Sequence, residues 1–242
     1  MKIIPLQEGS FTVDSTKQFI PFDQATDKIA DRGAGSLLVE IQPFLVVTSK
    51  DIILLDAGLG FMQNGQYQIV QNINANGIGA AEVTKVFLSH LHKDHIGGIY
   101  DEVNNRPLFE SATYYVQRAE WERALSLSSA SYQKEKLLWM ENHPQVQWLD
   151  GSGVIDGYIK YEISGGHCLF HQTAMIVDEG EIIFYGGDEA PQLQQMKHRF
   201  VAKYDADGKR AMQLRQDWMK RAEMESWTFL FYHDIKHPSW KF

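Results

Sequence analysis

The sequence predicts an α/β fold in which short apolar strands alternate with amphipathic helices. Apolar runs of strand length recur between residues 36 and 234, and segments between them carry apolar residues at helical spacing. Hydrophobic residues make up 44% of the 242-residue chain, which is enough to fill two apolar layers. The candidate functional residues are spread over most of this length, so we expect residues 1–242 to form a single domain.

The first half of the chain predicts strands that are interrupted by one helix. Five runs have the length and composition of strands: Ser36–Ile41, Leu45–Thr48, Ile52–Leu55, Thr84–Ser89 and Ala112–Val116. The turn Ser49-Lys50-Asp51 suits a hairpin between the second and third of these strands. The segment Tyr67–Ala75 carries Ile69 and Ile73 on one face and ends before Gly77, so it predicts an amphipathic helix.

The second half repeats this plan. Four further runs predict strands: Val146–Leu149, Tyr158–Ile163, Ile182–Tyr185 and Thr228–Tyr232. From Asp205 onward the chain is expected to be helical, because Ala211, Leu214, Trp218 and Ala222 recur at intervals of three and four residues.

Residues 118–142, between the two halves, predict a helical insertion. Arg118–Leu125 and Tyr132–Met140 have helical character, and the second segment stops near His143-Pro144. We expect the large apolar residues of the insertion to pack in the core: Trp121, Leu125, Leu137, Leu138 and Trp139. The alternative is a lid over a functional site, in which Trp121 or Trp139 would contact the substrate.

The segment His90-Leu91-His92-Lys93-Asp94-His95 carries the strongest functional signal in the chain. It follows an apolar strand, so His90 and His92 alternate and point to the same side. Asp94 and His95 come next, where the following Gly97-Gly98 pair favours a turn. Imidazole and carboxylate groups are typical ligands of Zn²⁺ and its first-row neighbours. The segment therefore predicts a site for two metal ions that lie close together.

The pattern His90-x-His92-x-Asp94-His95 resembles the signature of the metallo-β-lactamase superfamily. Four further residues occur in the order that this family expects: Asp56 after an apolar strand, His167 after Gly166, Asp188 after Ile182–Tyr185, and His233 after Thr228–Tyr232. The resemblance implies a four-layer αββα sandwich, with two mixed sheets face to face, helices outside and the metal ions at one edge.

The resemblance also implies two metal sites that share Asp188: His90, His92 and His167 for one ion, and Asp94, His95 and His233 for the other. Two divalent ions that share a water bring its pKa toward neutrality, so hydroxide is available at physiological pH. Asp94 is the expected catalytic residue, because a ligand carboxylate can also orient the water and pass its proton to the leaving group. Ligation without a proton role is the alternative.

Two residues are expected behind the ligands. Asp56 ends a strand close to the imidazoles, where a carboxylate fixes their tautomer and orientation. His171 follows His167 by four residues, as in many relatives, but Cys168-Leu169-Phe170 replaces their Thr-Pro-Gly. Cys168 is expected to be a small buried residue. Three other histidines have no supporting spacing and are expected at the surface: His143, His198 and His237.

The identity of the metal follows from His92. Redox enzymes of the flavodiiron branch have Glu at this position, and oxygen-rich ligation favours iron. A histidine there favours zinc and hydrolysis, with iron or manganese as alternative metals. A diiron-type redox enzyme and an inactive scaffold are the two alternatives outside hydrolysis.

The overall length, the form of the motif and the insertion resemble the lactonase, esterase and organophosphate-hydrolase branch. This implies cleavage of a lactone, ester or phosphotriester in a small molecule. Many lactonases have a tyrosine three residues after the bridging Asp, where this chain has Pro191, and Tyr185 is a candidate substitute. A glyoxalase-like thioesterase and a β-lactam hydrolase are alternatives, although the tail Lys236–Phe242 offers little of the basic region that glyoxalases use.

The composition limits the expected partners. The net charge is −8, with 31 Asp and Glu against 23 Lys and Arg, and the basic run Lys197-His198-Arg199 is short, so we expect no nucleic acid. The chain has no run of eighteen apolar residues, so we expect no membrane span. The apolar stretch in Met1–Pro5 is too short for the core of a secretory signal. Cys168 is the only cysteine, so no internal disulfide forms and a cytoplasmic location is expected. The sequence leaves a homodimer open.

Overall fold

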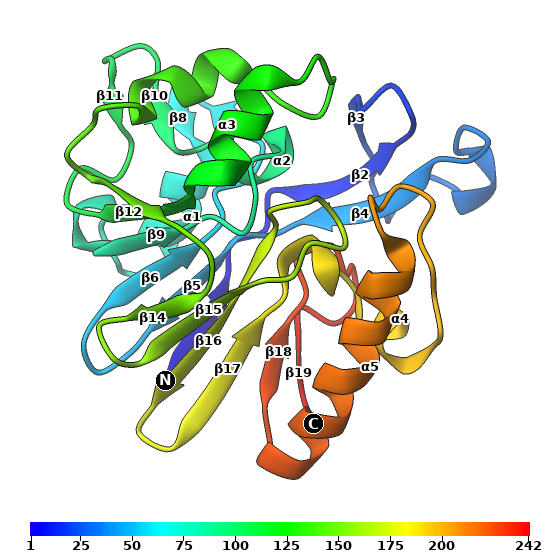
Figure 1. Ribbon diagram of the computed structural model, residues 1–242. Helices are drawn as coiled ribbons and strands as arrows, with labels where there is room; N and C mark the ends of the chain where they lie inside the picture. The colour runs from blue at the N-terminus through cyan, green and yellow to red at the C-terminus, as the bar shows by residue number, and fades with distance from the viewer.

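Two six-stranded mixed sheets lie face to face in the computed structural model, which describes residues 1–242 (Figure 1). The first sheet has the order β1 (Lys2–Pro5), β5 (Phe44–Val47), β6 (Ile52–Leu55), β9 (Lys85–Phe87), β12 (Thr113–Gln117) and β13 (Val146–Leu149). The second has the order β14 (Gly153–Ile155), β15 (Ile159–Ile163), β16 (Gln172–Asp178), β17 (Glu181–Tyr185), β18 (Thr228–Leu230) and β19 (Ser239–Lys241).

Helices cover the outer face of each sheet, so the predicted αββα sandwich is confirmed. The first sheet is covered by α1 (Gln68–Ala75), α3 (Arg118–Ser126) and the 3₁₀ helix η3 (Lys134–Met140). The second sheet is covered by α4 (Leu193–Lys197) and α5 (Gly208–Glu225), drawn in orange in Figure 1. A separate three-stranded sheet has the order β3 (Phe19–Pro21), β2 (Gly9–Val13) and β4 (Leu37–Ile41).

The remaining elements are short. They are η1 (Ile29–Asp31), β7 (Met62–Gln63), β8 (Gln66–Tyr67), η2 (Ala80–Glu82), α2 (Lys93–Ile96), β10 (Tyr100–Asp101), β11 (Arg106–Pro107) and η4 (Gly187–Glu189).

Three apolar clusters fill the three interfaces between the four layers. The period of two along each strand divides its side chains between neighbouring clusters. In β6, for example, Leu54 packs under the helices of the first layer, whereas Ile53 and Leu55 pack between the sheets. In β17, Tyr185 faces the other sheet and Phe184 faces α5. Strands that are buried on both faces explain why so many runs in this sequence are continuously apolar.

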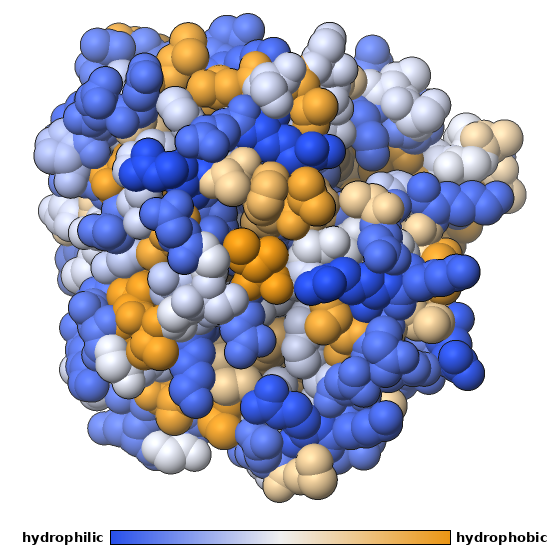
Figure 2. Space-filling model, in the orientation of Figure 1, coloured by the Kyte–Doolittle hydropathy of each residue, from blue (hydrophilic) through white to orange (hydrophobic).

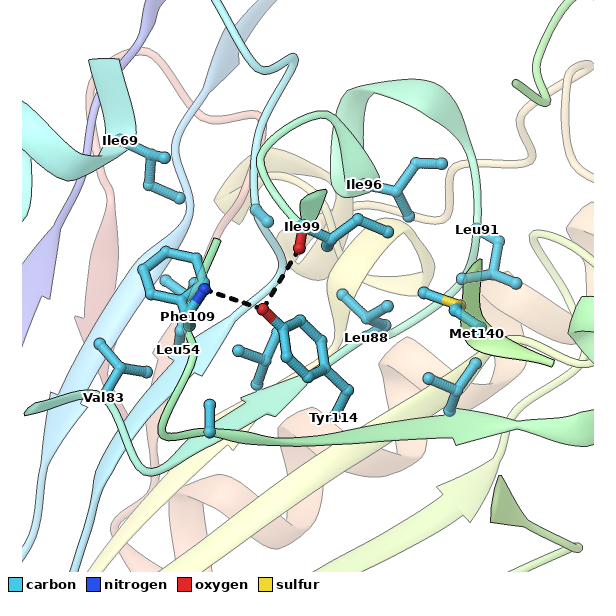
Figure 3. Close-up of a cluster of buried hydrophobic side chains, with 14 of the residues drawn as sticks. Leu54, Ile69, Val83, Leu88, Leu91, Ile96, Ile99, Phe109, Tyr114 and Met140 are labelled. Atoms are coloured by element: carbon cyan, nitrogen blue, oxygen red, sulfur yellow. Dashed lines mark hydrogen bonds between the residues drawn. The ribbon is translucent and has the colours of Figure 1, made fainter. Parts of the chain in front are cut away.

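The apolar cluster between the first sheet and its helices includes the buried hydroxyl of Tyr114 (Figure 3). The Tyr114 hydroxyl accepts a hydrogen bond from the Phe109 backbone N–H at 3.0 Å and donates to the Ile99 carbonyl at 3.2 Å. Both hydrogen-bonding roles of the phenol are therefore satisfied, which offsets the cost of burying it. These bonds tie the loop after α2 to β12.

Several strands were not predicted from the sequence. β1, β2 and β3 precede the first predicted strand, and β16 was also missed although it is central in the second sheet. β16 contains Gln172, Thr173 and Asp178, all buried, so its run is less apolar than its neighbours. Its polar side chains are used locally: Gln172 Nε2 donates to the Leu88 carbonyl at 2.7 Å. The expected strand Ser36–Ile41 exists as β4, but it pairs with β2 in the separate sheet.

The helical insertion packs mainly as core. Trp121 is 9% exposed, its ring lies 5.1 Å from that of Trp148, and its Nε1 donates to the Leu137 carbonyl at 3.0 Å. Trp139 stacks on Tyr100 with ring centroids 5.1 Å apart. The lid alternative for these two tryptophans is therefore wrong, because both rings are engaged inside the first layer. The prediction that the large apolar residues of the insertion pack in the core is also wrong for one of them.

That residue is Leu138, which is 58% exposed. It lies on η3, where the tighter 3₁₀ turn directs its side chain to solvent while Leu137 and Met140 point inward.

Replacing Trp121 with Ala is expected to lower the free energy of unfolding by about 3–5 kcal/mol, because it removes a large buried ring and leaves a cavity. Chemical denaturation measures this loss. The matched control is Leu138→Ala on the same segment, for which we expect a small change because the side chain is exposed. A stable Trp121→Ala protein that loses activity only toward long acyl substrates would instead restore the lid hypothesis.

No helix in the structure combines the length and apolar character that a membrane crossing requires. The face shown in Figure 2 is mostly hydrophilic, with apolar side chains in small groups rather than one broad patch.

Candidate metal centre

The histidine motif lies at the carboxyl end of β9. The strand ends at Phe87, His90 and His92 follow it, with His92 in extended backbone, and α2 then begins at Lys93. Asp94 and His95 lie on this short helix, so the turn expected there is a helical one. His95 N–H donates to the His92 carbonyl at 2.9 Å, which closes the turn and brings the motif side chains to one side.

The glycines after the motif serve a close approach between two backbones. A Cβ on Gly97 would lie 1.9 Å from the backbone carbon of Leu59, so no larger residue fits there. Gly97 N–H donates to the Gly58 carbonyl at 2.7 Å, and Ala57 N–H donates to the His95 carbonyl at 2.7 Å. These bonds fasten α2 to the loop that follows Asp56.

The other three predicted ligands come from the second sheet. His167 lies in the loop between β15 and β16, Asp188 lies in η4 directly after β17, and His233 follows β18. β17 and β18 are parallel neighbours, so the residues that follow them, Asp188 and His233, lie at the same edge of the sheet. The structure thus brings all seven predicted ligands to one edge of the sandwich.

The first group consists of His90, His92, His167 and Asp188, whose candidate ligand atoms all lie within 4.8 Å of one another. His92 presents Nδ1, which lies 2.9 Å from His90 Nε2 and 3.2 Å from His167 Nε2. Asp188 Oδ2 lies 3.3 Å from His167 Nε2 and 3.9 Å from His90 Nε2.

The second group consists of Asp94, His95 and His233. Asp94 Oδ2 lies 3.7 Å from His95 Nε2 and 3.6 Å from His233 Nε2. Asp188 Oδ1 lies 3.2 Å and 3.0 Å from the same two nitrogens. Asp188 therefore offers one oxygen to each group, which is the arrangement of a bridging ligand.

These residues fit divalent metal ions. His95 Nε2 and Asp188 Oδ1 are buried and make no hydrogen bond within the chain, although buried polar atoms are nearly always paired. The pKa of His90 lies well below its usual range, mainly because the ring is buried and also because other imidazoles lie next to it. Its ring is therefore neutral, as a metal ligand must be. Burial opposes ionisation of Asp188, but His233, His95 and His167 together hold its pKa well below the usual range. Burial alone would lower the pKa of His95, His167 and His233, but Asp188 outweighs it and raises all three, so a metal ion would displace these protons when it binds.

Asp56 lies beside this group, and both of its carboxylate oxygens accept hydrogen bonds from the chain. Its Oδ2 accepts from the Ser89 hydroxyl at 2.6 Å, from His95 Nδ1 at 2.7 Å and from the Tyr185 hydroxyl at 2.5 Å, and its Oδ1 accepts from Ser89 N–H. Its backbone is left-handed, with φ of 56°. Both carboxylate oxygens thus accept hydrogen bonds, and the contact with His95 is one through which Asp56 could orient that ring. A carboxylate oxygen of Asp56 also lies within 4.8 Å of candidate ligand atoms on His90 and His95.

Other histidines have partners of their own that the sequence did not reveal. His167 Nδ1 lies 2.9 Å from Asp205 Oδ1, and His233 Nδ1 donates to the Glu40 carbonyl at 2.8 Å. Asp205 is 38 positions from His167, and a backbone carbonyl carries no side-chain signal. No local pattern could have identified either partner.

His171 and Glu189 form a buried pair of supports. His171 Nδ1 lies 2.8 Å from the Ser164 hydroxyl, which also donates to Glu189 Oε2 at 3.0 Å. The same carboxylate oxygen accepts from His167 N–H at 2.9 Å. Sequence reasoning missed Glu189, although its position next to Asp188 was a usable signal.

The remaining residues singled out from the sequence lie outside the group. Cys168 is buried, with Sγ 3.5 Å from Glu120 Oε1. His198 is exposed, and His143 and His237 are partly exposed; none of the three lies in either ligand group.

Comparison with known families fits this geometry. A model of the metallo-beta-lactamase superfamily matches residues 40–224, which is most of the chain and includes six of the seven clustered residues. The chain belongs to the metallo-β-lactamase superfamily.

Among curated proteins, the N-acyl homoserine lactonase AttM of Rhizobium johnstonii is 33% identical over 116 residues. The AttM of Agrobacterium fabrum is 30% identical over 120 residues. Each alignment covers 44% of this chain and 41% of the relative, so the similarity spans less than half of either protein.

Solved structures of the superfamily share the fold over nearly the whole chain. A probable metal-dependent hydrolase from Staphylococcus aureus superposes with a TM-score of 0.78 at 19% identity, covering 99% of this chain and 91% of its own. The dizinc quorum-quenching lactonase AidC, in complex with a product, gives 0.73 at 18% identity, covering 96% and 87%. The hydrolase AbOPH gives 0.75 at 24% identity, covering 99% and 89%.

The clustered residues open into a cavity of about 170 Å³. One wall carries His92, Asp94, His167, Asp188 and His233. An apolar part of the lining comes from the small N-terminal sheet: Val13, Phe19, Leu37, Leu38 and Val39. From the insertion at 118–142, only Ser131 lines the cavity. The apolar cover of the site is therefore the sheet β3–β2–β4.

The expected substitute for the missing lactonase tyrosine is also wrong. Tyr185 is fully buried and its hydroxyl is bound to Asp56, so it cannot reach a substrate. Pro191 does line the cavity, and so does Tyr204 from the loop before α5. Gln195 Nε2 donates to the Tyr204 oxygen at 3.3 Å, so this bond does not use the phenolic proton.

Proposed function

We propose that this chain is a dinuclear, zinc-dependent hydrolase that cleaves an ester-like bond in a small molecule. The observation that carries the proposal is the position of Asp188, whose two oxygens face two separate ligand groups. Ligands come from both sheets, so in this proposal residues 1–242 act as one domain.

The ligand roles follow from the two groups. His90, His92 and His167 would hold one ion, and Asp94, His95 and His233 the other, with Asp188 between them. Two divalent ions supply Lewis acidity at the substrate oxygen and lower the pKa of a shared water. A histidine-rich set with two aspartates favours zinc, which also supports hydrolysis over a redox reaction.

Asp94 is the chain's own group for moving the proton. It is buried beside His95 and His233, and the Tyr232 hydroxyl donates to its backbone carbonyl at 2.5 Å, which fixes its position. It also lines the cavity, so its carboxylate contacts the space where the reacting bond would lie. A carboxylate in that position can orient the water and deliver its proton to the leaving alkoxide.

The substrate class is supported by the cavity and by the relatives. The curated relatives are N-acyl homoserine lactonases, and the cavity is lined by apolar side chains as well as by the ligands. An acyl chain would lie along β2 and β4 while its ester or lactone carbonyl reaches the metal ions that the ligands would hold.

The test is elemental analysis of the protein as isolated, followed by hydrolysis by as-isolated and zinc-loaded protein of a panel of lactones, aryl esters, thioesters and phosphotriesters. We expect two metal ions per chain and the highest kcat/KM for a lactone or ester. Cleavage of thioesters alone would favour the glyoxalase-like alternative. Bound iron with a visible absorbance spectrum and no hydrolysis would overturn the proposal.

Tyr204 is the chain's candidate to hold the substrate carbonyl. We expect Tyr204→Phe to lower kcat by about tenfold, the value of a lost hydrogen bond to a developing negative charge, with metal content unchanged. Steady-state kinetics with the best ester measures this. Phe200→Leu on the same wall is the matched control, since it removes an aromatic ring but no hydroxyl. Equal kcat for wild type and Tyr204→Phe would remove Tyr204 from the reaction.

A further inference from the structure

Two lysines lie on the rim of the cavity. Lys17 comes from the loop between β2 and β3, and Lys93 is the first residue of α2, between His92 and Asp94. Both side chains are half-buried, although lysine is mostly found fully exposed. They come from segments that are far apart in the sequence and meet only at this rim.

The position of Lys17 is built by its loop. Asp14 closes the turn, because its carbonyl accepts from Lys17 N–H at 3.0 Å and its side chain accepts from Thr16 N–H at 2.9 Å. Lys17 itself has a left-handed backbone with φ of 58°, a conformation that a non-glycine residue adopts at a cost. Lys17 lines the cavity, whereas the neighbouring residues of the loop are exposed.

Neither amine forms an ion pair within the chain, although Asp94 follows Lys93 directly. The lysine side chains that form ion pairs are those of Lys85, Lys136 and Lys220. Lys93 Nζ instead lies over the Phe19 ring, 5.8 Å from its centroid. Burial lowers the pKa of Lys93, Asp94 raises it and Lys17 lowers it, so both neighbours act on its charge. Two lysines without an ion pair that line one cavity provide a place for an anion.

We propose that Lys17 and Lys93 form a subsite for a carboxylate on the substrate, at the end remote from the bond that is cleaved. The inference rests on the proposed hydrolase function and names its substrate class: an ester or lactone with a short apolar segment and a terminal carboxylate. The apolar segment would lie against Phe19 and Val39, between the rim lysines and the ligand wall. A carboxylate carries less negative charge than a phosphate and is therefore repelled less by Asp94 and Asp188 in the same cavity.

A matched pair of esters tests the preference. The mono-4-nitrophenyl ester of adipic acid and 4-nitrophenyl hexanoate have the same chain length, but only the first ends in a carboxylate. We expect zinc-loaded wild type to favour the anionic ester by about tenfold in kcat/KM, the value of one charge-assisted contact. The preference should shrink at high salt, because the rim is partly open to solvent.

Variants assign the preference to the two lysines. In Lys17→Met and Lys93→Met the ratio of kcat/KM for the two esters should fall toward one. Methionine keeps the apolar stem and removes the charge. The matched control is Lys220→Met on the exposed face of α5, which should keep the wild-type ratio. An unchanged ratio in both cavity variants, or no preference in wild type, would overturn the subsite.

A binding measurement separates this inference from the proposed function. Calorimetry on zinc-loaded protein compares adipate with hexanoate, so that one carboxylate is common to both ligands and only the second differs. We expect adipate to bind about tenfold more tightly in wild type, and equally with hexanoate in Lys17→Met. If no ester is cleaved while this difference holds, the hydrolase proposal fails and the subsite stands. Equal binding of both acids by wild type removes the subsite, whatever the activity.

Discussion

Replacing Asp188 with Asn is expected to abolish nearly all hydrolysis, with a loss of at least about 10³-fold in kcat/KM. Asp188 offers one oxygen to each ligand group. Although burial opposes its ionisation, His233, His95 and His167 hold the pKa of its carboxyl well below the usual range. An amide has the same shape but presents a single oxygen and no charge, so it cannot serve both groups. The ions should therefore bind more weakly and lie farther apart.

The measurement is metal content after dialysis, together with kcat/KM for the best ester of the panel. Asp150→Asn, in an exposed loop, is the control for loss of one negative charge. We expect Asp188→Asn to hold fewer than two ions, and the control to be indistinguishable from wild type. An Asp188→Asn protein that keeps two ions and most of its activity would show that this residue does not bridge.

Asp94→Asn is expected to retain the fold and to lose at least ~10²-fold in turnover. The substitution removes both a negatively charged ligand and the group that would carry the proton. The backbone around it should remain in place, because the Tyr232 hydroxyl contacts the Asp94 carbonyl and not its side chain. Circular dichroism and thermal unfolding would verify the fold, and kcat would report the chemistry.

Metal content distinguishes the two roles of Asp94. A variant that binds two ions and turns over slowly indicates a role in proton transfer, whereas a variant that binds one ion indicates ligation. A substrate with a better leaving group should recover part of the loss only in the first case, since it needs less protonation. Normal turnover with both ions bound would leave Asp94 without a catalytic role.

Local sequence patterns were sufficient for the architecture and for the seven candidate ligands. Alternation along runs such as Ile52–Leu55 reflects burial on both faces, and this property is encoded by neighbouring residues. The ligands could be found because each follows a recognisable strand, and strand ends meet at an edge of a sheet. The strand β16 was not predicted because it contains polar residues. Hydrogen bonds to distant segments, such as that of Gln172 to the Leu88 carbonyl, offset the cost of burying these side chains.

The tertiary structure alone decided what surrounds the ligands. Asp205 behind His167, Tyr204 in the cavity wall and Lys17 on its rim all come from segments distant from the motif. The apolar cover is the sheet β3–β2–β4 and not the tryptophans of the insertion, although both segments offered large apolar residues. Composition shows that a residue is to be buried, but the partner against which it packs depends on how distant layers meet. For this chain, the sequence determined the seven candidate metal ligands, and only folding determined the pocket that they face.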